Sequence, residues 1–166
     1  FEDRSFSFVF QEDRLLPWKT AEDNIRLVLK GKISGQKIED TISKNLALVN
    51  MSDFSTYYPH QLSGGMRQRV SFARAFSFPS DIILFDEPFR GLDLHLKYQL
   101  MQNIRSILAK DARTVIMVTH DPEEAVFFGR KILLLGDKPV RVVAQFEQGS
   151  TNTGSRDPDA LLRQIR

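Results

Sequence analysis

Three apolar, strand-like runs that each lead into polar side chains place the strongest constraint on how this 166-residue chain can fold. The runs and the polar residues at their ends are residues 5–10 with Gln11, residues 81–86 with Asp86 and Glu87, and residues 114–119 with His120. Helix-like patterns separate the runs, and strands that alternate with helices indicate an α/β domain with a largely parallel sheet. Because such sheets gather chemistry at the carboxyl ends of their strands, we expect these polar residues to converge.

The segments around these runs predict the domain organisation. Residues from about 20 to 80 are mainly helical in pattern, and Thr20 begins a sequence typical of a helix start. Core strands are expected at about 5–10 and within 81–146, where the run 81–86, apolar between its acidic ends, is typical of a strand covered on both faces. We therefore predict one domain over residues 1–148. Residues 149–166 are predicted to form a linker and a short C-terminal helix begun by Asp157 and Pro158.

Composition excludes several classes of function. The 23 basic and 21 acidic residues leave a net charge of +2, which indicates a mixed-charge surface and no nucleic-acid partner. The chain has no cysteine, so disulfides, thiolate metal sites and cysteine nucleophiles are excluded. It also has no apolar run of membrane-spanning length, so contact with a membrane requires a partner. Since it begins with Phe1 just before a strand, we expect a piece of a longer polypeptide.

The polar residues suit phosphate and magnesium chemistry, although each has a simpler explanation. Asp86 can hold Mg²⁺ while Glu87 orients water, but Asp-Glu-Pro also occurs at ordinary strand-to-loop junctions. His120 can donate a hydrogen bond to a phosphate, or serve a structural role at a strand end. Gln11 can contact a metal or water, or be a surface residue.

A glycine-rich turn before a helix adds a candidate anion site. Gly64 and Gly65 precede a good helix pattern, and Ser63 supplies a hydroxyl donor. Free N–H groups and the helix dipole at such a start favour an anion. The alternative is a plain glycine turn.

Taken together and in this order, these motifs resemble those of the ATPase subunits of ABC transporters. The signature motif, LSGGMRQR at residues 62–69, has four ordered companions: the Q-loop FQED at 10–13, the Walker B strand ILFDEP at 83–88, the D-loop GLD at 91–93 and the switch histidine in VTHD at 118–121. The resemblance spans residue 6 to about 146. Within the family, the chain is most similar to importers of nitrate, sulfonate, taurine and related small anions.

The resemblance implies an ATPase that hydrolyses ATP with Mg²⁺. Glu87 would act as the general base, Asp86 would hold Mg²⁺ through water, and His120 would contact the γ-phosphate. Gln11 would sense Mg²⁺ and the attacking water, and would couple the site to a transmembrane partner.

The same resemblance implies a split site. Ser63, Gly64 and Gly65 would contact the γ-phosphate of an ATP held by a second ATPase subunit in a head-to-tail dimer. Asp93 would connect the two sites. The other implied partners are permease subunits and, indirectly, a solute-binding protein, with the ATPase peripheral at the cytoplasmic face of the membrane. The apolar segment after the Q-loop is a candidate permease contact, or alternatively a core contact of the helical insert; it comprises Leu15, Leu16, Pro17 and Trp18.

One element of the family is missing from the sequence. No segment matches the phosphate-binding pattern G-x-x-x-x-G-K-[ST], so we expect the chain alone not to hold ATP tightly. The implied fold is a P-loop NTPase-like core without its N-terminal strands and phosphate loop, carrying an inserted helical subdomain. The family places the phosphate-loop strand beside residues 114–119, so we expect an exposed apolar edge there and a chain that associates.

Two accounts of the missing loop follow. In the first, the chain is part of an ATPase whose full form hydrolyses ATP. In the second, it is a non-catalytic module that donates Ser63 and its glycines to a partner's nucleotide. The presence of both Glu87 and His120 favours the first account. An ATPase of the chromosome-maintenance or DNA-repair type is a further alternative, but there a long coiled coil stands where this sequence has a short helical insert.

Overall fold

The computed structural model describes residues 4–136 and 139–147. The chain divides after Val118 into two compact units, Phe1–Val118 and Thr119–Arg166. The predicted linker and the helix predicted after Asp157 lie outside the described residues. The single domain predicted over residues 1–148 stays a prediction.

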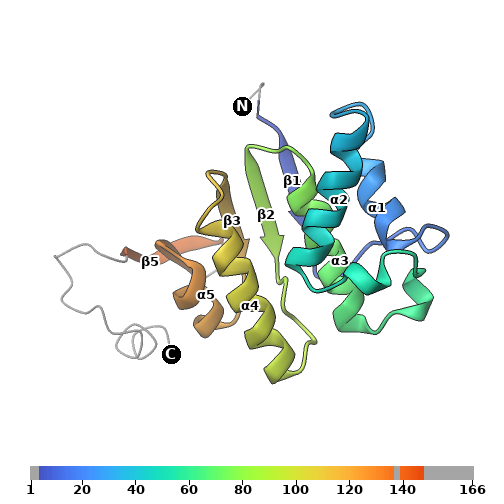
Figure 1. The fold of residues 1–166 in the computed structure, drawn as a ribbon. Coiled ribbons are helices and arrows are strands. Elements are labelled where there is room, and N and C mark those ends of the chain that lie inside the picture. Colours follow the sequence, from blue (N-terminus) through green and yellow to red (C-terminus); the bar gives the residue numbers. More distant parts are fainter. Residues whose placement is uncertain (1–3, 137–138, 148–166) are drawn as a thin grey trace. The chain divides into compact units, whose positions relative to one another are not determined.

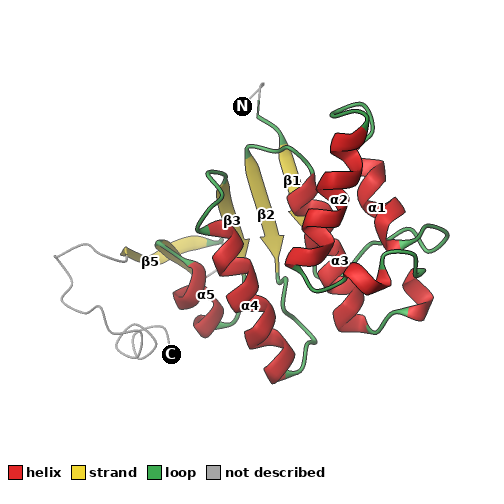
Figure 2. Cartoon of the chain, viewed as in Figure 1, coloured by secondary structure: helices red, strands yellow, loops and turns green. Residues whose placement is uncertain are grey.

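The first unit contains a parallel sheet and a helical segment inserted between its first two strands (Figures 1 and 2). In chain order its elements are β1 (Phe6–Val9), α1 (Ala21–Leu29), α2 (Gln36–Leu48), the 3₁₀ turns η1 (Ser52–Phe54) and η2 (Pro59–Gln61), α3 (Gly64–Ser77), β2 (Ile82–Asp86), α4 (Leu94–Leu108) and β3 (Thr114–Val118). This order confirms the predicted alternation and the helical insert.

The sheet has the order β1-β2-β3, and both neighbouring pairs are parallel. Val9 pairs with Phe85, and Asp86 pairs with Val118. The carboxyl ends of all three strands therefore reach the same edge of the sheet. Residues that follow β1 and β2 are brought together by this register.

Side-chain caps begin α1 and α4, and the cap of α1 is Thr20, where the sequence predicts a helix start. The Thr20 Oγ1 accepts a hydrogen bond from the Asp23 N–H at 3.2 Å, and α1 starts at the next residue. In the same way, the Asp93 Oδ1 accepts from the Leu96 N–H at 3.0 Å at the start of α4. Each cap satisfies one of the N–H groups that the first turn of a helix leaves without an intrahelical partner.

An aromatic cluster joins α3 to β2. Phe72 is fully buried, and its ring centre lies 5.5 Å from that of Phe85 on β2 and 5.6 Å from that of Phe89. Phe76 packs edge-on against Phe85 at 6.4 Å. Burial of each such ring stabilises the fold by about 1.5–3 kcal/mol, and each favourable ring pair adds about 0.5–1.5 kcal/mol. The cluster fixes α3 on one face of the sheet.

The opposite face of the sheet remains largely uncovered within this unit. Phe8, Leu84 and Ile116 are register partners on that face; Phe8 is 43% and Ile116 50% exposed, and Leu84 is partly exposed. Val118 on the edge strand β3 is 60% exposed. The prediction that residues 81–86 are covered on both faces is therefore wrong for the described residues. An apolar run in the sequence indicates that both faces of a strand are hydrophobic. It does not show which other elements of the fold cover those faces.

The second unit contains a short helix and a hairpin. Its elements are α5 (Pro122–Phe128), β4 (Lys131–Gly136) and β5 (Arg141–Glu147), and the two strands are antiparallel. Asp121 caps α5 by accepting from the Glu123 N–H at 2.8 Å. A side chain at Gly129 would place a Cβ 2.6 Å from the Ala125 carbonyl, so the tight turn between helix and hairpin requires glycine.

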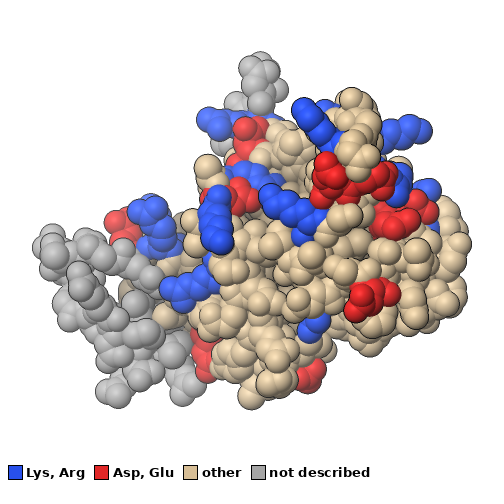
Figure 3. Space-filling model, in the orientation of Figure 1, with Lys and Arg blue, Asp and Glu red and all other residues tan. Residues whose placement is uncertain are grey.

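The surface carries charges of both signs. In the face that Figure 3 displays, Lys and Arg side chains are interspersed with Asp and Glu. This is the mixed-charge pattern that the balanced composition indicates. Among the described residues, none of the helices combines the length and the hydrophobicity needed to cross a membrane.

The exposed edge strand generates the first prediction. We expect the 166-residue chain to self-associate through β3 and the uncovered face, because unpaired strand edges with exposed apolar side chains template pairing. Ile116→Lys should shift the chain toward monomer in sedimentation velocity. Leu94→Lys is the matched control, because Leu94 is 67% exposed on α4 rather than on the sheet. A monomeric unmodified chain with a cooperative melt would contradict the expectation.

A buried hydroxyl on α3 generates the second prediction. Ser71 is fully buried, and its Oγ has no hydrogen-bond partner among the described residues. Ser71→Ala should raise the free energy of unfolding by about 1 kcal/mol, because it removes an unsatisfied polar group and improves helix propensity. Ser77→Ala is the control, since the buried Ser77 Oγ donates to the Ala73 carbonyl at 2.7 Å. Urea unfolding that ranks Ser77→Ala as the more stable variant would refute this account.

Candidate active site at the carboxyl edge of the sheet

Two acidic residues lie at the end of β2. Asp86 is the last residue of the strand and is exposed, and Glu87 follows it with a left-handed backbone at φ 43°. The Glu87 N–H donates to the Val118 carbonyl at 2.9 Å, which holds this residue against the end of β3. Its carboxylate accepts a hydrogen bond from Arg90 Nη1 at 2.9 Å. Non-glycine residues rarely adopt this backbone conformation, and it concentrates at functional sites.

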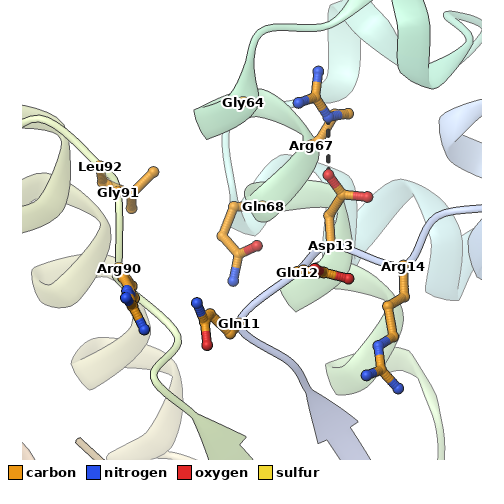
Figure 4. A pocket seen from close by; sticks show the side chains of 10 residues that line it. All are labelled: Gln11, Glu12, Asp13, Arg14, Gly64, Arg67, Gln68, Arg90, Gly91 and Leu92. Atoms are coloured by element: carbon orange, nitrogen blue, oxygen red, sulfur yellow. Dashed lines mark hydrogen bonds and ion pairs between the residues drawn. The ribbon is translucent and has the colours of Figure 1, made fainter. Parts of the chain in front are cut away.

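Gln11 lies at the same edge, just beyond β1. It lines an open cavity of about 470 Å³ together with residues of α3 and of the loop after β2. Figure 4 shows the Gln11 and Gln68 side chains projecting toward the same space, with Arg90 on its other side. Gly64, at the start of α3, also lines this cavity. The first unit therefore brings together the Q-loop, the signature helix and the loop after the Walker B strand.

The N-terminus of α3 begins with a serine cap followed by two glycines. Ser63 is the N-cap, and its Oγ accepts from the Met66 N–H at 3.3 Å, so the hydroxyl hydrogen can still donate. Gly64 is exposed, while a Cβ at Gly65 would lie 2.4 Å from Leu96 Cδ2. Bare backbone at Gly65 thus allows α3 to approach α4. These contacts fit the plain structural explanation of the turn, and anion binding there stays a prediction.

Helix α3 also holds the Q-loop through two arginines that the sequence did not predict as site residues. Arg67 Nε donates to the Asp13 carboxylate at 2.8 Å. Arg74 donates from Nη2 to the Asp13 carbonyl at 2.8 Å and from Nη1 to the Arg14 carbonyl at 2.7 Å. Arg67 and Arg74 are seven residues apart, which places them on one helical face, and this spacing was the signal available in the sequence.

The contact between Arg74 and the carbonyls of Asp13 and Arg14 is partly shielded from water. Burial lowers the pKa of the Arg74 guanidinium, and the nearby Asp13 carboxylate opposes that shift. An arginine in such a site must satisfy its donors with protein acceptors. The two Q-loop carbonyls supply them.

Two other predicted site residues lie at the starts of later segments. Asp93 caps α4 and is exposed. His120 is exposed and follows β3 in the chain, but it belongs to the second unit. Its placement relative to Glu87 therefore stays a prediction.

The predicted patch after the Q-loop divides into a buried and an exposed part. Leu15 is buried at 8% exposure, whereas Trp18 is 69% exposed. The division is decided by Asn24 on α1, whose side chain bonds both the N–H and the carbonyl of Leu16 and so fixes which way the neighbouring residues face. In the sequence alone, an asparagine within a helix pattern does not indicate which residues of a neighbouring segment are buried.

The oxygen atoms at the carboxyl edge of the sheet can supply only some of the ligands that a magnesium ion needs. Across the part of the chain that is described, no group of three or more His, Cys, Asp or Glu side chains is arranged to hold a metal. Mg²⁺ in phosphate-handling sites takes one or two carboxylates and completes its shell with phosphate oxygens and water. Asp86, exposed at the end of β2, suits that arrangement.

Comparison with known proteins identifies the family. A family model described as ABC transporter matches residues 1–90. The chain belongs to the ABC transporter family. Its relatives include a taurine import ATP-binding protein of Rhizobium johnstonii, 43% identical over 84% of this chain and 53% of that protein. They also include a nitrate import ATP-binding protein of Synechococcus elongatus, 36% identical over 82% of this chain and 51% of that protein.

These relatives confirm the resemblance predicted from the motifs. Aliphatic sulfonate import ATP-binding proteins, such as that of Bacillus subtilis at 37% identity over 81% of this chain, complete the predicted importer group. The chain spans about half the length of these curated relatives, 51% to 53% in the three cases given. Import proteins as relatives favour the importer interpretation over a chromosome-maintenance ATPase.

Solved structures confirm the fold. A dimeric structure of the ATP-binding cassette MJ0796 in a post-hydrolysis state with ADP and Pi matches with a TM-score of 0.73 and 34% identity, over 87% of this chain and 63% of that one. A second dimeric structure of the same ABC transporter cassette matches with a TM-score of 0.74. The ABC ATPase fold predicted from the motifs is thus correct.

The arginine contacts generate the third prediction. Arg74→Lys should loosen the Q-loop, because one ammonium group cannot reproduce a planar fork that bonds two carbonyls. Amides at residues 11–16 should exchange hydrogen roughly 10-fold faster, the effect of losing about 1.5 kcal/mol of charge-assisted hydrogen bonding. Arg69→Lys is the control, since Arg69 is partly exposed on the same helix and its side chain takes no part in the bonds to Asp13 and Arg14. Equal exchange in both variants would exclude this role for Arg74.

Proposed function

We propose that the full-length protein carrying this chain is the ATP-hydrolysing subunit of an ABC importer. The observation that carries the proposal is Glu87, held at φ 43° directly after Asp86 on the edge that Gln11 shares. The import ATP-binding relatives support the same function. We further propose that it acts as a head-to-tail dimer on permease subunits, with a solute-binding protein as an indirect partner, peripheral at the cytoplasmic face of the membrane.

The hydrolytic step is proposed to depend on Glu87 and Gln11. The Glu87 carboxylate accepts the proton of the attacking water, and the Gln11 amide orients that water. Asp86 is the residue that would hold Mg²⁺, and the ion would supply neutralisation of the negative charge on the phosphoryl group. Arg90 bonds the Glu87 carboxylate and limits the orientations it can take. His120 is proposed to contact the γ-phosphate.

The signature helix is proposed to complete the site of the second subunit. Ser63 Oγ and the N–H groups of Gly64 and Gly65 face an anion at the start of α3, where the helix dipole adds to their effect. The 14-residue length of α3 suits this role. Asp93, at the start of α4, is proposed to connect the two sites. Dimer closure then assembles catalytic groups that neither subunit holds alone, which matches a reaction that depends mainly on positioning.

The permease contact is proposed to centre on Trp18 and Pro17. Both are exposed, and Trp18 is the only tryptophan in the chain. Leu16 is partly exposed, and its N–H donates to Asn24 Oδ1 at 2.8 Å, which fixes the segment on α1. Leu15 supports the segment from the core. The proposed solutes are small anions such as those named for the relatives.

A second candidate function is that of a non-catalytic module, which donates Ser63 and its glycines to a partner's nucleotide. Catalysis by Glu87 distinguishes the two functions, because a pure donor has no use for a general base on its own subunit.

The fourth prediction tests the catalytic proposal in the full-length protein assembled with its permease. Glu87→Gln should lower ATP hydrolysis by roughly 10²–10⁴-fold, because the amide cannot accept the proton, while ATP affinity is retained. Turnover is measured by phosphate release, and affinity by calorimetry. Glu22→Gln on α1 is the control and should hydrolyse ATP normally.

Two outcomes would overturn the assignment. Unchanged turnover in Glu87→Gln removes the general-base role and leaves the donor function. In a parallel titration the 166-residue chain alone should show no micromolar affinity for ATP, since it has no phosphate loop. Micromolar binding would contradict that interpretation of the sequence.

A further inference from the structure

Gln68 joins the two loops that carry the proposed catalytic residues. It is buried at 6% exposure on α3, five residues after the N-cap Ser63. Its Nε2 donates to the Phe10 carbonyl at 3.3 Å and to the Pro88 carbonyl at 2.9 Å. Phe10 directly precedes Gln11, and Pro88 directly follows Glu87. One side-chain amide thus bonds the backbone on either side of the site.

The chemistry of the amide makes this connection specific. A glutamine NH₂ group has two N–H donors, and here each has a carbonyl acceptor. Both carbonyls lie just beyond strand ends, where the sheet ladder no longer supplies their hydrogen bonds. A buried carbonyl without a partner is costly, so the two loops and Gln68 stabilise one another.

The backbone at Glu87 needs such support. Its left-handed conformation persists only where the surroundings over-determine it. The Glu87 N–H is held by the Val118 carbonyl, and the Arg90 N–H donates to the Glu87 carbonyl at 3.2 Å. Gln68 adds a hydrogen bond from helix α3 to the carbonyl of Pro88, the residue after Glu87.

We propose that Gln68 is a positioning residue that ties α3 to both loops, so that Gln11 and Glu87 keep one relative placement and move together with the signature helix. The inference rests on the proposed function. Arg67 and Arg74 bond the Q-loop, whereas Gln68 reaches the loop after β2 as well. Gln68 therefore links the proposed sensor of the attacking water to the proposed base.

The kinetic test uses the full-length protein assembled with its permease. Gln68→Met keeps the length of the side chain and removes both donors. It should lower kcat roughly 10- to 100-fold, the effect expected when catalytic groups are misplaced by about 1 Å, with the Kd for ATP within about twofold. Gln102→Met, at an exposed position on α4, should leave kcat unchanged. Val70→Ala removes buried volume from α3 and measures the effect of destabilisation alone.

A double-mutant cycle separates positioning from general structural support. If Gln68 holds Gln11 in place, Gln11→Ala should lower kcat much less in the Gln68→Met background than in the unmodified protein. Additive effects, or a kcat loss in Val70→Ala equal to that in Gln68→Met, would assign Gln68 a merely structural role. Loss of turnover in Glu87→Gln with normal turnover in Gln68→Met overturns this inference alone. Unchanged turnover in Glu87→Gln removes the proposed function and this inference with it.

Hydrogen exchange provides a readout that does not require turnover. In Gln68→Asn, which is one methylene shorter and cannot span both carbonyls, amides in residues 10–16 and 86–92 should both exchange faster. In Arg74→Lys only the first segment should do so. Faster exchange confined to one segment in Gln68→Asn would contradict the bridge.

Discussion

Parallel pairing on both sides of β2 is the constraint on which the rest of the first unit depends. It aligns the carboxyl ends of three strands, so that Gln11, after β1, and Glu87, after β2, reach the same edge. Phe85 fixes the register, because a shift by one residue would turn its ring out of the aromatic cluster. The hydrophobic core therefore determines where Asp86 and Glu87 emerge. The packing of Phe85 in the core thus determines the position of the acidic residues that directly follow it.

Helix α3 combines three roles in one rigid element. Phe72 and Phe76 on one side join the core, and Arg67, Gln68 and Arg74 on another hold the Q-loop. Its N-terminus presents the capping serine and the glycines of the signature motif. Because the helix has 14 residues and regular hydrogen bonds, these sites cannot move independently of each other. A displacement of the glycine end of α3 would therefore also move the residues that bond the Q-loop.

The sequence predicted helices and strands well where a local signal, such as a cap, marks their ends. It predicted site residues only where they belong to a motif. The helix start expected at Thr20 is confirmed, because the Thr20 side chain caps α1, which begins at Ala21. Gln68 and Arg74 were not predicted as site residues, because a polar residue within a helix pattern is ordinarily on a solvated face. Their acceptors are 58 and 61 residues away in the chain, and only the folded structure brings them together.

The strain at Glu87 connects packing to chemistry. A left-handed backbone at a non-glycine residue costs roughly 1–3 kcal/mol, so it is retained only against compensating contacts. Those contacts come from the core: Pro88 and Phe89 are buried, and Phe89 stacks on Phe72 of α3. The carboxylate itself stays partly exposed, where a water molecule can reach it. The aromatic cluster thus helps to hold Glu87 in a backbone conformation that it would not adopt by itself.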